Sequence, residues 1–162
     1  MTFFFILIIG ILCLLVLGLV YWAPREPADL SLAAPKPIGD DLDHYLQDAE
    51  SAYSDIKPSL EKRIIWANDA KEKTLLSVVY LHGFSAASEE IRPVPDLVSN
   101  ALGSNLFFTR LQGHGREDKA LVEGTVAGWM VDLQEAILIG ERLGERVLLI
   151  STSTGGTLAA VA

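Results

Sequence analysis

The feature that most constrains this chain is a short apolar run that leads into small hydroxyl residues and glycines. Val147–Ile150 is apolar and partly β-branched, which predicts a buried strand, and the alanine-rich segment from Leu158 predicts the start of a helix. Between them lies Ser151-Thr152-Ser153-Thr154-Gly155-Gly156. A strand, a tight turn that carries serine and a helix are the context in which a small-x-Ser-x-Gly motif forms a nucleophile elbow.

Ser153 is the predicted nucleophile of this elbow. Ser151 is a poor candidate, because Leu149 would occupy the small position two residues before it. The backbone N–H of Thr154, at the N-terminus of the incoming helix, can point at a developing oxyanion. Ser151 stands where the usual motif has glycine, and a Ser/Thr/Gly cluster after a strand is also typical of a helix cap or a phosphate-binding loop. Both interpretations stay open on this stretch alone.

A second feature is the uncharged apolar run from Phe3 to Trp22. As a helix it would span roughly 30 Å at about 1.5 Å per residue, which matches the hydrocarbon core of a bilayer. Tyr21 and Trp22 stand where interfacial aromatic residues are found. We therefore expect residues 1–22 to form an uncleaved, single-pass membrane anchor, with residues 3–22 in the membrane.

A cleaved signal peptide is the competing interpretation of this run. It would have a basic start, which Met1-Thr2 does not provide, and the small-x-small site Ser31-Leu32-Ala33 lies far beyond the apolar stretch. Arg25 and Lys36 follow the span and nothing basic precedes it, which favours a cytoplasmic domain on a basis of only two charges. The side of the membrane therefore stays undetermined.

Composition excludes several classes of function. The chain carries 21 acidic and 13 basic residues, a formal net charge of −8, with no Lys/Arg cluster that could neutralise nucleic-acid phosphates. Its single cysteine, Cys13, lies in the apolar run and cannot form an internal disulfide. Three dispersed histidines do not make a metal-ligand set, so we expect neither a metal nor another cofactor.

The rest of the chain alternates between predicted strands and helices. Residues 23–40 contain four prolines and predict a linker, and residues 41–162 predict the folded domain. An amphipathic helix is expected from Leu42 to Ile56, and Thr125 is expected to cap another. The expected strands are 63–67, 75–81, 106–111 and 147–150, the first two joined as a hairpin, with a helix over 87–102. This order predicts an α/β domain with a mainly parallel sheet and flanking helices.

A second oxyanion donor is predicted where the strand 75–81 ends. His82 and Gly83 follow this strand directly, and the backbone N–H of Phe84 comes next. Gly83 lets the chain turn without a side chain that blocks the pocket. Because loops that leave the same edge of a parallel sheet can converge, we expect Phe84 and Thr154 to face one site with Ser153.

At these residues the chain resembles the α/β-hydrolase superfamily, in particular its monoacylglycerol-lipase and carboxylesterase-like branch. The resemblance covers about residues 63–162 and rests on Tyr80-Leu81-His82-Gly83-Phe84-Ser85, Gln112-Gly113-His114-Gly115 and Ser151-Thr152-Ser153-Thr154-Gly155-Gly156. It implies Ser153 as nucleophile, Phe84 and Thr154 as oxyanion donors, and His82 and Gly83 as the oxyanion loop. It also implies that His82 and His114 brace backbone and do not act as the base. We further expect Glu89 and Glu90 to be solvated charges near a helix start.

The chain departs from the family pattern after the elbow, because the family's Asp or Glu and its His follow the nucleophile. Only nine residues follow Ser153, and none is acidic or histidine. We therefore expect the N-terminal portion of a membrane-anchored serine hydrolase that cleaves carboxylic esters, plausibly lipid-like ones. On its own this portion is expected to be inactive. The alternatives are a non-catalytic, membrane-tethered α/β module that binds an acyl ligand or a protein, and another acyl-transfer reaction on the same fold.

Overall fold

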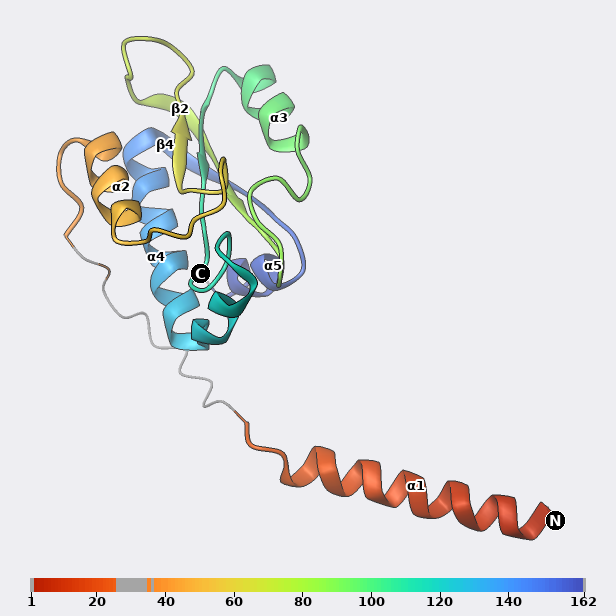
Figure 1. The fold of residues 1–162 in the computed structure, drawn as a ribbon. Helices are drawn as coiled ribbons and strands as arrows, with labels where there is room; N and C mark the ends of the chain where they lie inside the picture. Colours follow the sequence, from red (N-terminus) through yellow and green to blue (C-terminus); the bar gives the residue numbers. More distant parts are fainter. Residues whose placement is uncertain (1, 26–34, 36, 162) are drawn as a thin grey trace.

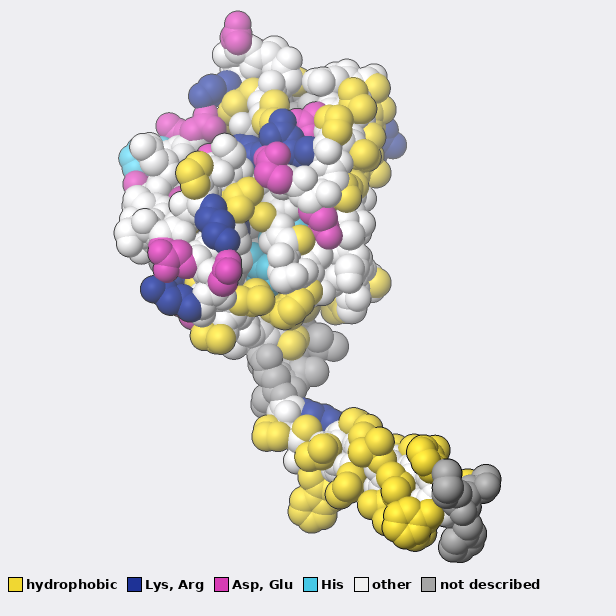
Figure 2. Space-filling view, turned by 45° about the vertical axis from the view of Figure 1, so that its right-hand side comes forward, with side chains coloured by type: hydrophobic (Ala, Val, Ile, Leu, Met, Phe, Trp, Pro, Cys, Tyr) yellow, Lys and Arg dark blue, Asp and Glu magenta, His cyan; other side chains and the backbone are white. Residues whose placement is uncertain are grey.

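The computed structural model describes residues 2–25, 35 and 37–161. Most of the expected linker, residues 26–34 and 36, and the candidate cleavage site at 31–33 lie outside the described residues. The helix α1 runs from Thr2 to Trp22 and exposes apolar side chains all round, whereas charged side chains are spread over the globular part (Figure 2). By length and composition α1 can cross a membrane, a criterion that a signal sequence also meets.

The domain is built on a mixed four-stranded sheet in the order β1-β3-β2-β4. Its strands are β1 Arg63–Ile65, β2 Thr74–Leu81, β3 Asn105–Phe108 and β4 Gly144–Ser151. β2 pairs in parallel with both β3 and β4, and β1 pairs antiparallel with β3. The predicted α/β class is confirmed. The sheet is mixed, however, because the β1–β3 pairing is antiparallel.

The expected hairpin between the first two strands is wrong. β3 inserts between β1 and β2, so β1 finds its partner some forty residues further along the chain, with Ile64 opposite Phe107. All four residues of β3 are buried, whereas β1 is only partly covered. An apolar strand with both faces buried belongs in the interior of a sheet, and the short β1 is left at the edge.

Alternate side chains of the central strands point to opposite faces and define two cores. Val79, Leu81 and Phe107 pack under α4 (Val126–Leu143) and α2 (Leu42–Ser51). Val78, Tyr80 and Phe108 face the side covered by α3 (Val94–Leu102). Figure 1 shows α2 and α4 on one side of the sheet and α3 on the other. The fold is therefore a three-layer α/β arrangement.

Two helices, α2 and α4, begin where a side chain accepts from one of their first free N–H groups. Asp41 accepts from the His44 N–H, and Thr125 accepts from the Gly128 N–H. α3 is shorter than expected and begins at Val94, because Pro93 and Pro95 suit only the first positions of a helix. Gly103 ends α3 in the left-handed conformation, with φ +58°.

Buried ion pairs fasten α2 to the rest of the domain. Glu50 accepts hydrogen bonds from Arg110 through both carboxylate oxygens, each at 2.8 Å. Lys62 is nearly buried and donates to Asp132 and to Glu135. Because a buried charge is costly unless it is paired, the Glu50–Arg110 pair fixes α2 against the end of β3. The Lys62 pairs fix the segment before β1 against α4.

Candidate active site

Ser153 stands on a sharp turn between β4 and the short helix α5 (Thr154–Ala159). Its backbone has φ +46° and ψ −110°, a conformation that non-glycine residues rarely adopt, and its side chain is exposed. Ser153 is the N-cap residue of α5, yet its side chain makes no capping hydrogen bond. The structure therefore presents this hydroxyl to solvent on a strained strand-to-helix bend.

The bend is held tightly against the end of β2. A Cβ placed on Gly155 would lie 2.2 Å from the carbonyl oxygen of Leu81, and the Thr152 N–H donates to that oxygen at 3.1 Å. Such a close approach leaves room only for glycine at position 155. The helix can then start directly beside the neighbouring strand, which is why Ser153 is forced outward.

The loop that follows β2 lies beside Ser153. A Cβ built on Gly83 would stand 3.5 Å from the Cβ of Ser153, so the two predicted segments meet at the carboxyl ends of parallel strands. Within the described part of the chain, the backbone N–H groups of Phe84 and Thr154 donate no hydrogen bond. The structure thus brings the loop and the elbow together and leaves both predicted donors without an acceptor.

His82 is a buried fixing point for this loop. Its Nε2 accepts the Leu111 N–H at 3.1 Å, so its Nδ1 carries the proton and donates to the carbonyl oxygen of Gly83 at 2.8 Å. Burial lowers the pKa of His82 to about 4, with the nearby His114 as a smaller cause. Both ring nitrogens are occupied, and the ring is neutral at pH 7.

His114 holds the next part of the same loop. Its Nε2 accepts the Ser85 N–H at 3.1 Å, and its Nδ1 donates to the carbonyl oxygen of Gln112 at 3.0 Å. Ser85 has φ +55°, so the loop turns sharply at the residue after Phe84. Neither His82 nor His114 can serve as a base towards Ser153 without losing a hydrogen bond that shapes the loop.

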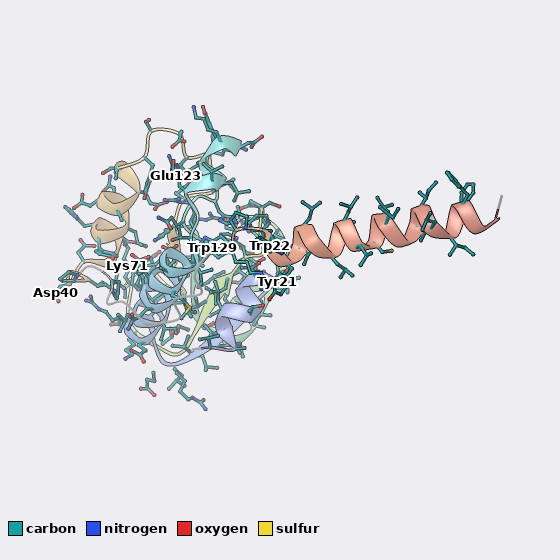
Figure 3. All side chains as sticks on the ribbon, turned by 90° about the horizontal axis from the view of Figure 1, so that it is seen from below. Tyr21, Trp22, Asp40, Lys71, Glu123 and Trp129 are labelled. Atoms are coloured by element: carbon teal, nitrogen blue, oxygen red, sulfur yellow. The ribbon has the colours of Figure 1, made fainter. Side chains whose placement is uncertain are left out.

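An aromatic group lies beside the predicted donor Phe84. The Phe84 ring is 55% exposed and packs edge-on against His114, at 5.8 Å between centroids, and against Trp129, at 6.1 Å. Trp129 donates its indole N–H to the carbonyl oxygen of Gln112. Figure 3 looks onto this end of the domain and shows Trp129 towards its middle, with Glu123 at the rim. A cavity of about 330 Å³ lies next to Ser85 and His114, and Ser153 does not line it.

Glu90 is a residue of the site that the sequence did not identify. It precedes α3 in a turn, and its Oε2 accepts the Gly83 N–H and the Tyr80 hydroxyl, each at 2.8 Å. Glu89 pairs with Arg63 and Arg92 at the surface. Both glutamates are exposed, as expected, but Glu90 also accepts two hydrogen bonds that the sequence did not predict. No local signal marks Glu90, because its partner Gly83 lies in a preceding loop.

Comparison with known proteins adds no identification. Models of known protein families gave no match to the chain, and curated proteins gave no significant match. What the fold and the site define is an α/β protein that exposes a serine on a strand-turn-helix bend, next to a glycine loop with free backbone donors. The functional assignment rests on that geometry and on the motifs.

Proposed function

We propose that this chain carries the nucleophile and oxyanion hole of a membrane-anchored serine hydrolase of the α/β-hydrolase superfamily, acting on carboxylic esters. The observation that carries the proposal is the exposed Ser153 at φ +46°, held beside the Gly83 loop. A nucleophile elbow requires this strained, outward-facing serine on a strand-to-helix turn. In the described sheet the strand before it, β4, pairs with β2 alone and lies at the edge. If Ser153 served only as a helix cap, its hydroxyl would accept a hydrogen bond from one of the first N–H groups of α5. The Ser153 hydroxyl makes no such bond.

In the proposed reaction the Ser153 hydroxyl attacks the ester carbonyl carbon. The carbonyl oxygen becomes an oxyanion, which accepts hydrogen bonds from the N–H groups of Phe84 and Thr154. A general base takes the hydroxyl proton and passes it to the leaving alcohol as the C–O bond breaks, and the acyl group stays on Ser153 until water releases it. The aromatic side chain of Phe84 borders the site with an apolar surface, which suits an apolar acyl or alcohol group.

The attacking serine needs a base, and the three histidines of this chain do not provide one. His82 and His114 have both nitrogens engaged, and His44 is exposed on α2 beside Asp48. The proposed reaction therefore requires a base other than these histidines. The same observation favours the second candidate function, a non-catalytic, membrane-tethered α/β module that binds an acyl ligand or a protein.

A fluorophosphonate probe separates the two candidates, since it reacts covalently with an activated serine. The protein in its full length is expected to be labelled, and Ser153→Ala is expected to lose the label. Ser151→Ala is the matched control, because it removes a hydroxyl from the same motif and is expected to keep the label. Absence of labelling, or labelling that survives Ser153→Ala, would exclude the hydrolase and favour the binding module.

The membrane part of the proposal concerns α1. An uncharged, apolar helix over Phe4–Trp22 suits a retained anchor. A retained anchor predicts that the protein from membranes resists alkaline carbonate extraction and keeps residues 1–22 in its intact mass. A cleaved signal sequence would instead give a mature protein that lacks this segment.

A further inference from the structure

Glu90 lies within a chain of hydrogen bonds that runs from Gly83 to Thr152 and joins the two loops of the proposed site. Its Oε2 accepts from the Gly83 N–H and from the hydroxyl of Tyr80, which is fully buried. Tyr80 has a single hydroxyl proton, and it points to Glu90. Its oxygen therefore accepts from the hydroxyl of Thr152, 3.2 Å away. Thr152 stands directly before Ser153.

This chain of bonds connects the two backbone segments that hold the proposed donors. Gly83 precedes Phe84 in the loop after β2, and Thr152 lies two residues before Thr154 on the elbow. Thr152 is fixed to β2 a second time, through its own N–H and the carbonyl oxygen of Leu81. The bond from the Gly83 N–H to Glu90 is different, because it holds a loop that has no strand pairing of its own.

We propose that Glu90 is a positioning residue of the hydrolase: its carboxylate holds the Gly83 peptide so that the neighbouring Phe84 N–H faces the oxyanion. This inference rests on the proposed function. Glu90 is not a catalytic residue in this scheme, since it contacts the loop and not the reacting atoms. Its role is to accept a hydrogen bond from the Gly83 N–H, with a side chain just long enough to extend there from the turn before α3.

The charge of Glu90 is not what the loop needs. The position that a Cβ of residue 83 would occupy lies 2.9 Å from Glu90 Oε1 and 3.5 Å from the Cβ of Ser153, so the carboxylate is close to the nucleophile. A negative charge at this place opposes a developing oxyanion, while the carbonyl oxygen of an amide could accept the same two bonds. The neutral, isosteric glutamine should therefore serve at least as well as glutamate.

Two substitutions separate reach from charge. Glu90→Gln keeps the acceptor and removes the charge, whereas Glu90→Asp keeps the charge and withdraws the carboxylate by one methylene. Glu89→Asp is the matched control, since it shortens the neighbouring glutamate, which pairs with Arg63 and Arg92 instead. The measurements are the second-order rate of fluorophosphonate labelling of the full-length protein and the amide hydrogen exchange of the peptide around residues 82–86.

We expect labelling of Glu90→Asp to be up to roughly ten-fold slower, which is the effect of losing one ordinary hydrogen bond. Amide exchange of the loop should accelerate in the same variant. Glu90→Gln and Glu89→Asp should retain the wild-type labelling rate and exchange. This pattern supports a positioning role. A general loss of stability would not depend on the length of the side chain at position 90 and be independent of its charge.

The proposal is overturned if Glu90→Asp labels as fast as wild type, or if Glu90→Gln is as slow as Glu90→Asp. If the wild-type protein takes up no label, the proposed function is contradicted. Amide exchange of residues 82–86 then tests whether Glu90 holds the loop. In that event, unchanged exchange of the loop in Glu90→Asp would overturn the bracing role as well, and faster exchange would support it.

Discussion

The substitution Gly155→Ala tests directly whether α5 starts as close to β2 as the structure indicates. The new methyl carbon would lie 2.2 Å from the carbonyl oxygen of Leu81 and 2.7 Å from that of His82. Both are backbone atoms of, or next to, the central strand β2, so no flexible side chain can move aside. Overpacking of this kind costs about 1–3 kcal/mol in typical cores, and we expect about 3 kcal/mol or more here because only backbone can yield.

The neighbouring glycine supplies a matched control. A Cβ on Gly156 would meet only the hydroxyl oxygen of Ser151, at 3.6 Å, which is an ordinary contact. Gly156 lies inside α5, where replacing glycine with alanine stabilises by about 0.5–1 kcal/mol through the unfolded state. The same chemical change at adjacent positions is therefore expected to have opposite signs.

The assay is urea unfolding of the whole chain in detergent, followed by tryptophan fluorescence, with thermal unfolding as a second measure. Gly155→Ala should lower the midpoint temperature by about 10 °C or prevent folding, and Gly156→Ala should leave it unchanged or raise it. If Gly155→Ala proves as stable as wild type, α5 does not approach β2 in this way. The strained bend at Ser153 would then lose its cause.

The other predictions concern the loop and the buried charges. The pKa of His82 is lowered by burial to about 4 from an unfolded value of 6.5, so the unfolded state binds the additional proton between these values. The free energy of unfolding should therefore fall by about 3 kcal/mol as pH drops from 6.5 to 4, measured by urea unfolding across this range. The same series on His82→Gln gives the contribution of all other titrating groups, which is subtracted from the wild-type values. Lys62→Met leaves the carboxylates of Asp132 and Glu135 buried without their cation and should cost about 3–5 kcal/mol in urea unfolding at pH 7. In Gly83→Ala the new methyl would lie 2.9 Å from Glu90 Oε1 and 3.5 Å from the Cβ of Ser153. It should displace the carboxylate that holds the loop and crowd the serine, and so abolish fluorophosphonate labelling. Stability should change by less than about 1 kcal/mol, because the displaced atoms end a flexible side chain.

Local sequence signals located most of the secondary structure. The capping residues Asp41 and Thr125 and the stop at Gly103 act within a few residues of themselves, so they could be recognised without the fold. The helix α3 starts later than its pattern predicts, because Pro93 and Pro95 suit only the first helical positions, and tertiary bonds of Glu89 and Glu90 hold the turn before Val94. Such bonds leave no periodic pattern.

The pairing of β1 shows where local reasoning fails. A polar loop between two apolar segments predicts a hairpin between β1 and β2. However, β3 competes with β1 for the same edge of β2, and β3 is the strand with both faces buried. Burial of Phe107 and Phe108 in the two cores decides this competition. The outcome depends on residues forty positions away, which no short-range signal contains.

The sequence by itself determined the α/β class, the apolar N-terminal helix and the strand-turn-helix context of Ser153, because each is a property of neighbouring residues. Only the tertiary structure decided that the Gly83 loop lies beside that serine. It also decided that the ring nitrogens of His82 and His114 hold this loop by hydrogen bonds, and that Glu90 joins the loop to the turn at Ser153. The physical reason is that parallel strands gather distant loops at one edge of the sheet. Hydrogen bonds between those loops depend on distances that the order of residues does not encode locally.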